Sequence, residues 1–241
     1  MPGDRAGLDA LPGPISTPGF DCAPYLTATG CVTRNPETGV QNMGTYRAGL
    51  KASDRMVVRM ATRVGGAGGY VHYKKHRERG DKYMPVAIVL GCPPAVAFMG
   101  PQKLPIDVDE VGVAGGLVGA PIRLTKARSV DLLIPAESEL VIEGQIDTEM
   151  LEPEGPFGEF TGYASYRSTE NVFVAKRIQM RKQPYFHSVA SGTAADHIWV
   201  SSISREAEIM NALSRNLPNV KAVHVPTTTV GALMAVVSMR K

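Results

Sequence analysis

The stretch SVDLLIPAESELVIEGQID, residues 129–147, decides the expected fold. Two of its parts, Asp131–Ile134 and Glu139–Gln145, carry branched apolar side chains in the alternation that favours β-strands. The residues between them, 135–138, are too few for a βαβ crossover, which needs about a dozen residues or more. A sheet-dominated α+β fold is therefore expected, with a barrel surrounded by helices as its favoured form.

Further strands are expected on both sides of this stretch, where apolar or β-branched runs are bounded by turn residues. They are Tyr25–Val32, Asp54–Ala61, Met84–Leu90, Ile122–Ala127, Asn171–Arg181, Tyr185–Ala190, Val220–Val225 and Leu233–Met239. Helical spacing of apolar residues predicts one long helix over Ala195–Asn216, and shorter helices are expected at Tyr70–Arg79 and Asp107–Val118. Asp107 or Asp109 is expected near the N-cap of the last of these helices.

The expected elements divide the chain into three parts. Residues 1–24 hold five prolines and four glycines, which predicts an extended N-terminal arm or a disordered tail. Residues 25–190 are expected to form the core. Residues 191–241 then add a helix and strands that complete this core.

The composition is that of an ordinary soluble globular protein, with 44% of the 241 residues hydrophobic and 20% charged. The formal net charge is only +3. The one dense basic run, residues 74–79, is interrupted by Glu78 and followed by Asp81. It is interpreted as a solvated helix face, and nucleic-acid binding is set aside.

Cysteine usage and apolar runs bear on the expected compartment. The three cysteines, Cys22, Cys31 and Cys92, show no metal-type spacing, and a sparse, odd number argues for a reducing environment. The first residues lack the apolar core of a signal peptide, and no apolar run approaches the roughly 20 residues that span a bilayer. The expectation is a cytoplasmic protein without a membrane span.

Three carboxylates crowd the segment LEPEGPFGEFTGY, residues 151–163. Its glycines and proline permit a turn that could direct Glu154 and Glu159 into one pocket. Two carboxylates that share a desolvated site repel each other, so one keeps its proton and can act as an acid. The alternative is a solvated loop in which Glu152, Glu154 and Glu159 all face water.

The segment TRNPETGVQNMGTYR, residues 33–47, carries Asn42, Thr45 and Arg47 after a turn. In a strand the odd spacing would place Asn42 and Arg47 on opposite faces, and a bulge at Gly44 could bring them together. The alternative is a hairpin with an exposed arginine.

In the segment VAFMGPQKLPIDVDE, residues 96–110, Gly100, Pro101 and Pro105 predict an irregular loop between the apolar residues 97–99 and the cluster of acids. Such a loop can place backbone N–H groups against a phosphate or a flavin ring. Its acids Asp107, Asp109 and Glu110 either enrich a helix N-terminus or supply an oxygen ligand to a hard cation such as Mg²⁺ or Mn²⁺.

Together with MPVAIVLGCPPAVAFMGPQKLP, residues 84–105, and the stretch at 129–147, these segments resemble the UbiD family of decarboxylases, which use prenylated FMN (prFMN). They occur in the family's order, and the similarity runs from about Leu11 to the end of the chain. The resemblance implies a split β-barrel core with flanking helices. It also implies non-oxidative, reversible decarboxylation of an aromatic or α,β-unsaturated carboxylic acid, with the modified flavin as the electron sink.

The family's catalytic Glu-Arg-Glu set falls on Arg47, Glu154 and Glu159. The resemblance implies that Glu159 donates the proton and that Glu154 pairs with Arg47 and orients it. The cofactor-binding residues that it implies are Asn42, Thr45, Arg47, Gly100, Gln102 and Glu110. Asn42 and Glu110 would also hold a divalent metal, Mn²⁺ or Mg²⁺, and K⁺ is a further candidate cation. The implied partners are a flavin prenyltransferase that supplies the cofactor and a second copy of the chain or another subunit.

Two departures from the family keep alternatives open. Arg63 falls where the family usually has a histidine as third metal ligand, and an arginine stays protonated and cannot ligate a metal. The chain is also considerably shorter than the family's enzymes. The alternatives are a truncated, non-catalytic module or subunit that binds flavin or phosphate, and a split-barrel flavin reductase. Retention of Arg47, Glu154 and Glu159 favours decarboxylation over both.

Overall fold

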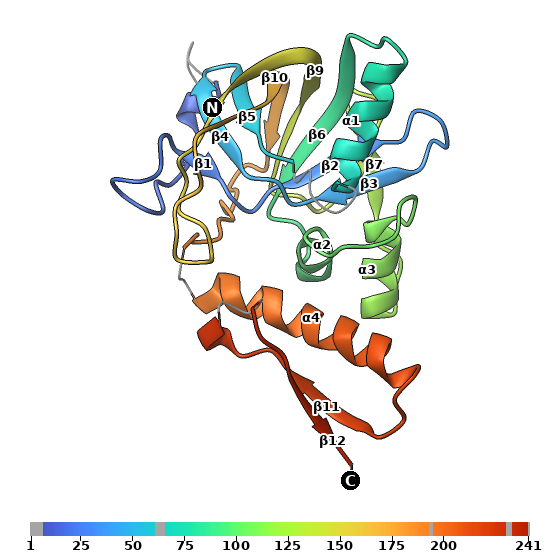
Figure 1. Ribbon diagram of the computed structural model, residues 1–241. Coiled ribbons are helices and arrows are strands. Elements are labelled where there is room, and N and C mark those ends of the chain that lie inside the picture. Colours follow the sequence, from blue (N-terminus) through green and yellow to red (C-terminus); the bar gives the residue numbers. More distant parts are fainter. Residues whose placement is uncertain (1–6, 61–65, 193–194, 230–232, 241) are drawn as a thin grey trace. The chain divides into compact units, whose positions relative to one another are not determined.

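The computed structural model describes residues 7–60, 66–192, 195–229 and 233–240 (Figure 1). These residues divide into two compact units. The first consists of the described residues within 7–15, 22–155 and 167–188. The second consists of Ser16–Asp21, Pro156–Tyr166 and the described residues from Val189 onward.

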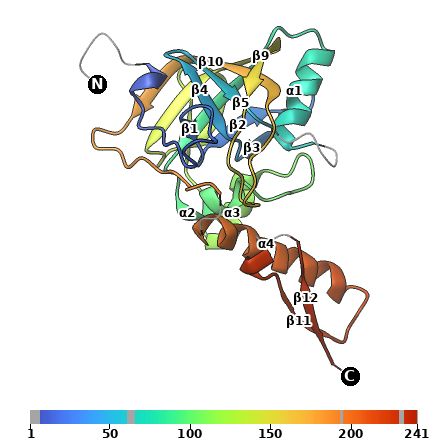
Figure 2. The ribbon, with the colours of Figure 1, turned by 60° about the vertical axis from the view of Figure 1, so that its left-hand side comes forward.

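An antiparallel sheet of eight strands forms the first unit. In spatial order its strands are β1 (Tyr25–Leu26), β4 (Ala48–Ala52), β5 (Arg55–Val58), β10 (Ser168–Met180), β9 (Leu140–Glu154), β6 (Tyr83–Leu90), β2 (Gly30–Arg34) and β3 (Gln41–Gly44). A separate pair, β7 (Leu124–Lys126) and β8 (Leu133–Pro135), completes the strands of this unit. The long strands β9 and β10 pair with each other in the middle of the sheet, as Figure 2 shows from a second side.

The central strand β6 explains why the sheet is covered on both faces. Successive side chains of a strand point to opposite faces. Met84, Val86 and Ile88 belong to one buried cluster and Ala87 and Val89 to another. A side chain of this kind contributes about 1.5–3 kcal/mol when it is fully buried. The continuous apolar run MPVAIVL therefore fits a strand that lies between two cores.

Three helices of the first unit pack against the two faces of the sheet. Tyr73 of α1 (Gly68–Glu78) is buried in the cluster of Met84, whereas α2 (Pro94–Met99) and α3 (Glu110–Val118) contribute Val96 and Val111 to the other cluster. A short 3₁₀ helix, Leu8–Ala10, packs Leu8 into the cluster of α1.

The pairing of β9 with β10 shifts register twice, between Asn171 and Phe173 and between Ala175 and Arg177. Gly144 of β9 lies so close to β10 that a Cβ at this position would collide with the carbonyl oxygen of Val174. Bulges of this kind bend and twist a strand. They allow β9 and β10 to run as strands of 15 and 13 residues.

The second unit contains a long helix and a two-stranded hairpin. The helix α4 (Ala195–Ser214) is followed by β11 (Val220–His224), a 3₁₀ turn at Thr227–Thr229 and β12 (Val236–Met239). Glu206 of α4 accepts hydrogen bonds from the His224 ring and from the Val225 N–H, both at 2.8 Å. These bonds tie the helix to the end of β11.

The expectation of a sheet-dominated α+β fold with few helices is confirmed. Among the described ladders, β1 and β3 lie at opposite ends of the strand order and do not pair, so the sheet is open rather than a closed barrel. The split barrel stays a prediction. In the part of the chain described here, none of the helices has both the length and the hydropathy needed to cross a bilayer.

The described elements differ from the expected ones in three places. Tyr185–Ala190 lies outside any strand, although each of these residues is described. The helix α2, which begins at Pro94, was not among the expected helices. The segment that contains Glu152 and Glu154 was expected to be a loop, but it is the end of β9.

Candidate active site

Arg47 and Glu154 form a buried, two-point ion pair in the first unit. Arg47 follows the hairpin of β2 and β3, and Glu154 is the last residue of β9. Arg47 Nε donates to Glu154 Oε1 at 2.8 Å, and Nη2 donates to Oε2 at 2.9 Å. The side chains are 13% and 1% exposed. Two parallel, charge-assisted bonds fix the plane of the guanidinium as well as its distance.

Two further groups hold the Glu154 carboxylate. The Tyr25 hydroxyl donates to Oε1 at 2.9 Å, and Arg59 Nη1 lies 3.4 Å from Oε2. Burial raises the pKa of Glu154, but hydrogen bonds and charge from Arg47, the bond from Tyr25 and the charge of Arg59 outweigh it, so that this pKa lies below its usual value. Glu154 is therefore held as a carboxylate.

A second acid lies beside this network. Arg59 directly follows β5, and its Nε lies 3.7 Å from Oε1 of Glu170 on β10. Burial is the largest influence on Glu170 and raises its pKa. Arg55, the first residue of β5, pairs with Glu152 at 3.0 Å. Glu152 and Glu154 thus pair with arginines at the two ends of β5, Arg55 at its start and Arg59 directly after it.

Asn42 of β3 and Glu110, the first residue of α3, form a second contact between expected site residues. Glu110 begins α3, is 5% exposed, and accepts the Met43 N–H at 2.8 Å. With its amide nitrogen turned toward Glu110, Asn42 donates to Oε1 at 3.1 Å. Turning the amide over directs its oxygen at the carboxylate, which a cation between the two oxygens would favour. Burial raises the pKa of Glu110.

The acids near the start of α3 have separate tasks. Asp109 caps the helix by accepting the Val111 N–H at 2.9 Å, as expected for an N-cap. Asp107 has a positive φ of 64° and accepts from the Asn35 amide at 2.8 Å. Only Glu110 of the three faces Asn42.

Thr45 and Gly100 also lie together. The Thr45 N–H donates to the Gly100 carbonyl at 3.2 Å, and a Cβ on Gly100 would come within 2.8 Å of the Thr45 hydroxyl. The side chain of Gln102 turns back and donates to the Phe98 carbonyl at 2.7 Å. Gly100 and Gln102 therefore cap the end of α2 next to Thr45.

Glu159 belongs to the second unit, within a tight hairpin of residues 157–165. Its N–H donates to the Tyr163 carbonyl at 2.9 Å, and its own carbonyl accepts the Gly162 N–H at 3.0 Å. The Glu159 side chain is half-buried. The backbone of Glu159 is thus fixed by its own turn.

The structure groups the expected site residues into pairs. Arg47 lies with Glu154, Asn42 with Glu110, and Thr45 with Gly100. A bulge at Gly44 could have brought Asn42 and Arg47 together, but Asn42 contacts Glu110 of α3 and Arg47 contacts Glu154 of β9. Arg63 lies outside the described residues.

Sequence reasoning missed three residues that contact or flank the pair: Tyr25, Arg59 and Glu170. Glu152 and Glu154 are two residues apart in β9 and so share a strand face, and this alternation could have indicated that they have neighbouring partners. Arg59 lies just beyond the end of β5, so strand alternation does not indicate its contact. Tyr25 lies 129 positions from Glu154, and no local pattern points to that contact.

The donor and acceptor chemistry fits the groups that the resemblance implies. Asn42 and Glu110 offer oxygen ligands of the kind that Mg²⁺ and Mn²⁺ prefer. Within the described ranges no cluster of three or more His, Cys, Asp or Glu side chains accompanies them. Asn42, Thr45 and Arg47 supply amide, hydroxyl and guanidinium donors within one short segment, which suits a phosphate.

Known proteins are similar to this chain over most of its length. Residues 1–194 match the UbiD family model described as the 3-octaprenyl-4-hydroxybenzoate carboxy-lyase Rift-related domain. HmfF, a UbiD-class enzyme from Pelotomaculum thermopropionicum solved with FMN, is 30% identical at a TM-score of 0.91, over 99% of this chain and 52% of that one. An evolved dimeric form of HmfF solved with prFMN is 31% identical at a TM-score of 0.86, over 92% of this chain and 51% of that one.

Vanillic acid decarboxylase from Sedimentibacter hydroxybenzoicus, in its closed form, is 28% identical at a TM-score of 0.81. The match covers 91% of this chain and 46% of that one. The chain thus spans about half the length of the solved relatives that it matches. With the family model matched over residues 1–194 and the fold shared with HmfF, the chain belongs to the UbiD family.

Proposed function

We propose that this chain is the core of a carboxy-lyase that uses prFMN to decarboxylate an aromatic or α,β-unsaturated carboxylic acid, reversibly and without net oxidation. The observation that carries this proposal is the Arg47–Glu154 pair. Arg47 donates from two nitrogens to both oxygens of a carboxylate that is 1% exposed. Such a pair presents a guanidinium in a fixed plane, which suits recognition of a planar carboxylate.

In the proposed mechanism Arg47 binds the carboxylate of the substrate and Glu154 orients Arg47. Because Glu154 stays ionised, the Arg47 side chain keeps one orientation throughout the reaction. When bound, prFMN supplies the electron sink that lets CO₂ leave. Glu159 donates a proton to the carbon that has lost CO₂, and general acid catalysis of this kind contributes about 10²–10⁴-fold in rate.

The proposed cofactor site uses the pairs beside Arg47. Asn42 and Glu110 would hold a divalent cation, Mn²⁺ or Mg²⁺, and K⁺ is a further candidate. Thr45, Gly100 and Gln102 would line the cofactor. Support comes from the two relatives solved with FMN and prFMN and from the oxygen ligands of Asn42 and Glu110.

The proposal extends to the organisation of the whole protein. A split β-barrel of residues 25–190 would form the core, with residues 1–24 as an arm and residues 191–241 completing it. A flavin prenyltransferase would supply the cofactor in the cytoplasm. A second copy or a partner subunit would complete the assembly, and the dimeric form of HmfF supports this arrangement.

Release of ¹³CO₂ tests the proposal. The prFMN-loaded chain is incubated with aromatic and acrylic acids labelled at the carboxyl carbon, and the headspace is analysed by mass spectrometry. Glu149→Gln, a change of an exposed glutamate on β9, serves as the matched control for changes at Glu159. We expect label in the gas from at least one acid, with the control equal to the wild type.

Two other outcomes would replace the proposal. Tight flavin binding with NAD(P)H oxidation and no labelled CO₂ would identify a flavin reductase. A chain that releases no CO₂ alone but does so after addition of a second subunit would be a partner-dependent subunit, and a chain inactive in every combination would be a non-catalytic module.

A further inference from the structure

The segment Ser16–Asp21 lies in the same compact unit as the loop Pro156–Tyr166, although the two are far apart in the sequence. We refer to them as the N-terminal clasp and the Glu159 loop. Within the clasp, the N–H groups of Phe20 and Asp21 donate to the Thr17 carbonyl at 3.1 and 3.0 Å. The clasp is therefore a closed turn with a defined shape of its own.

Asp21 joins this turn to the Glu159 loop through both of its carboxylate oxygens. Oδ2 accepts the Thr17 N–H at 2.9 Å, and Oδ1 accepts the Gly158 N–H at 2.9 Å. The second bond spans 137 positions of sequence. Hydrogen bonds to an ionised acceptor are roughly twice as strong as those between neutral groups.

The contact at Gly158 is close as well as polar. A Cβ at Gly158 would collide with the Thr17 side chain, so only glycine allows the loop backbone to approach the clasp this closely. Gly158 is buried and pairs with Ala164 in an isolated bridge. The residue next to Gly158 is Glu159, whose N–H is held by the Tyr163 carbonyl.

We propose that Asp21 is a positioning residue for Glu159, an inference that rests on the proposed role of Glu159 as proton donor. Asp21 accepts the N–H of Gly158, and the Tyr163 carbonyl accepts the N–H of Glu159. Two successive peptide groups at the start of the loop are therefore held in place. Asp21 itself binds only backbone and takes no part in the chemistry. A displacement of about 1 Å in a reacting group can cost about 10²-fold in rate.

The test compares Asp21→Ala and Asp21→Asn with wild type, in the full chain with prFMN. Hydrogen exchange of peptides that cover residues 157–165 reports on the loop, and kcat and KM report on the reaction. For Asp21→Ala we expect exchange about tenfold faster and kcat lowered at least about tenfold, with KM and the prFMN absorbance unchanged. Asparagine keeps one carbonyl oxygen as acceptor, so Asp21→Asn should lie between these values.

The control is Asp9→Asn, which changes an exposed carboxylate near the same end of the chain and should leave every readout unchanged. Unchanged exchange in both Asp21 variants would overturn the proposal. Faster exchange with unchanged kcat would overturn it too, because the loop would then be held for another reason. A wild-type chain that releases no CO₂ would remove the proposed function, and the exchange measurement would still decide whether Asp21 holds the loop.

Discussion

Glu154 and Glu159 are five positions apart, yet they lie in different compact units and differ in burial. Glu154 ends a 15-residue strand in the first unit, is 1% exposed, and is bonded through its side chain to Arg47 and Tyr25. Glu159 lies in a hairpin of the second unit, is half-buried, and is fixed through its backbone.

The difference teaches how one residue type can serve two tasks. A carboxylate whose pKa is lowered by an arginine pair carries no proton to give, but it can hold a guanidinium in place. Under the proposed function, Glu154 orients Arg47 and Glu159 donates the proton, so the two tasks would fall on glutamates in different elements.

The largest expected effect is on turnover after Glu159→Gln. Glutamine keeps the shape of glutamate but cannot donate the same proton, so we expect kcat to fall by about 10²–10⁴-fold. The prFMN absorbance and the free energy of unfolding should stay near the wild-type values. Steady-state CO₂ release, with Glu149→Gln as control, measures the effect. An unchanged kcat would remove Glu159 from the role of donor.

Glu154→Gln should instead act mainly on stability. It removes one partner of a buried ion pair and leaves Arg47 with an uncompensated charge, which costs about 3–5 kcal/mol. Urea unfolding of the apo chain measures this difference, and Glu149→Gln, at an exposed position of the same strand, should change the free energy by less than about 0.5 kcal/mol. Equal effects of the two substitutions would contradict the proposed contribution of the Arg47–Glu154 pair to stability.

The pH dependence of that difference follows from the lowered pKa of Glu154. The unfolded chain binds the proton at about pH 4.3 and the folded chain only at lower pH. The stabilisation by ionised Glu154 is therefore fully present above about pH 4.3 and is lost as the pH falls through the folded-state pKa. The difference in the free energy of unfolding between wild type and Glu154→Gln should become smaller only in this acid range.

Glu170→Gln is the matched control for this titration, because the pKa of Glu170 is raised by burial. For a raised pKa the sign reverses, and stability is lost as the pH increases through the folded-state value. The wild type should therefore lose stability relative to Glu170→Gln as the pH rises. If the stability contributed by Glu154 and by Glu170 changed in the same direction with pH, the assigned pKa shifts would be wrong.

The smallest expected effect is that of Tyr25→Phe. It removes one hydrogen bond to the Glu154 carboxylate while Arg47 remains, so we expect a loss of about 1.5 kcal/mol in the free energy of unfolding. A loss as large as that of Glu154→Gln would mean that Tyr25, rather than Arg47, holds the carboxylate.

Much of the sheet could be predicted because its strands carry their signal locally. The run MPVAIVL is apolar on both faces of its strand, as burial between two cores requires. The helices α1, α3 and α4 were indicated by the spacing of apolar residues or by an N-cap residue such as Asp109. The end of β9 was missed because Glu152, Pro153 and Glu154 are poor strand residues. Pairing with β10, at Thr169 and Ser168, keeps them in the sheet.

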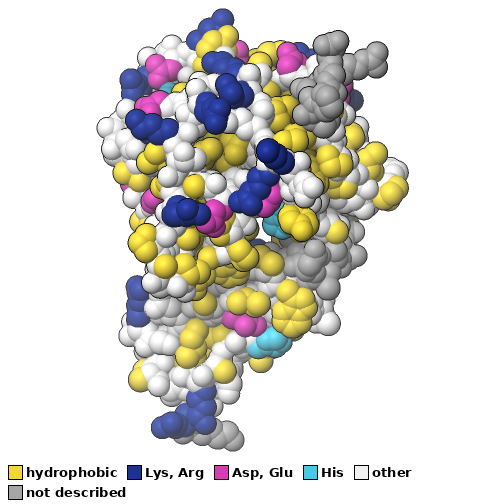
Figure 3. Space-filling view, turned by 180° about the vertical axis from the view of Figure 1, so that it is seen from behind, with side chains coloured by type: hydrophobic (Ala, Val, Ile, Leu, Met, Phe, Trp, Pro, Cys, Tyr) yellow, Lys and Arg dark blue, Asp and Glu magenta, His cyan; other side chains and the backbone are white. Residues whose placement is uncertain are grey.

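The site was predictable only in part for a related reason. The segments that carry Arg47, Glu154 and Glu159 are contiguous and could be recognised. The contacts that give these residues different surroundings join distant positions, as Tyr25 does with Glu154 and Asp21 with Gly158. The length and spacing of local patterns contain no information about such pairs. On the face drawn in Figure 3, lysine and arginine side chains stand among carboxylates and apolar side chains.

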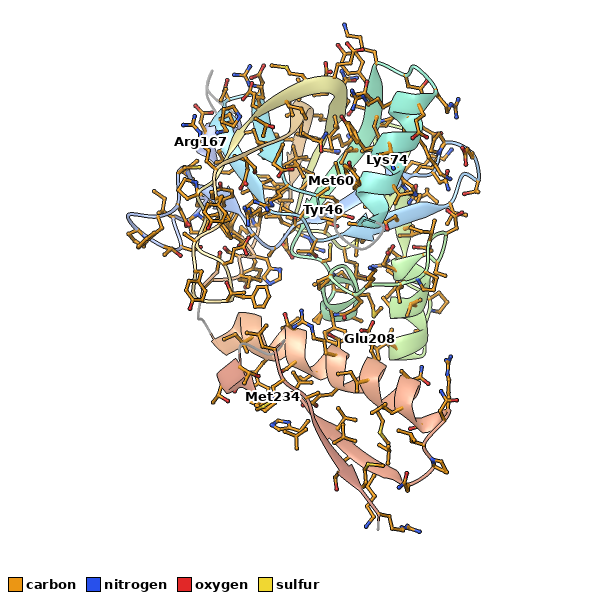
Figure 4. The ribbon with its side chains drawn as sticks, in the orientation of Figure 1. Tyr46, Met60, Lys74, Arg167, Glu208 and Met234 are labelled. Atoms are coloured by element: carbon orange, nitrogen blue, oxygen red, sulfur yellow. The ribbon has the colours of Figure 1, made fainter. Side chains whose placement is uncertain are left out.

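Tyr46 illustrates how such contacts build the site (labelled in Figure 4). Its hydroxyl accepts the Gly69 N–H at 3.0 Å, at the start of α1, and burial raises its pKa to about 12. It therefore stays a neutral phenol that anchors the segment between Asn42 and Arg47 to a helix.

Cofactor loading tests the central claim most directly. The chain is co-expressed with a prenyl-FMN synthase, and its absorbance spectrum and intact native mass are recorded, with Glu110→Ala alongside. We predict a flavin-type absorbance and a mass gain of one prFMN per chain, with lower occupancy in Glu110→Ala. A colourless chain without added mass would contradict the claim that this chain contains a complete prFMN site.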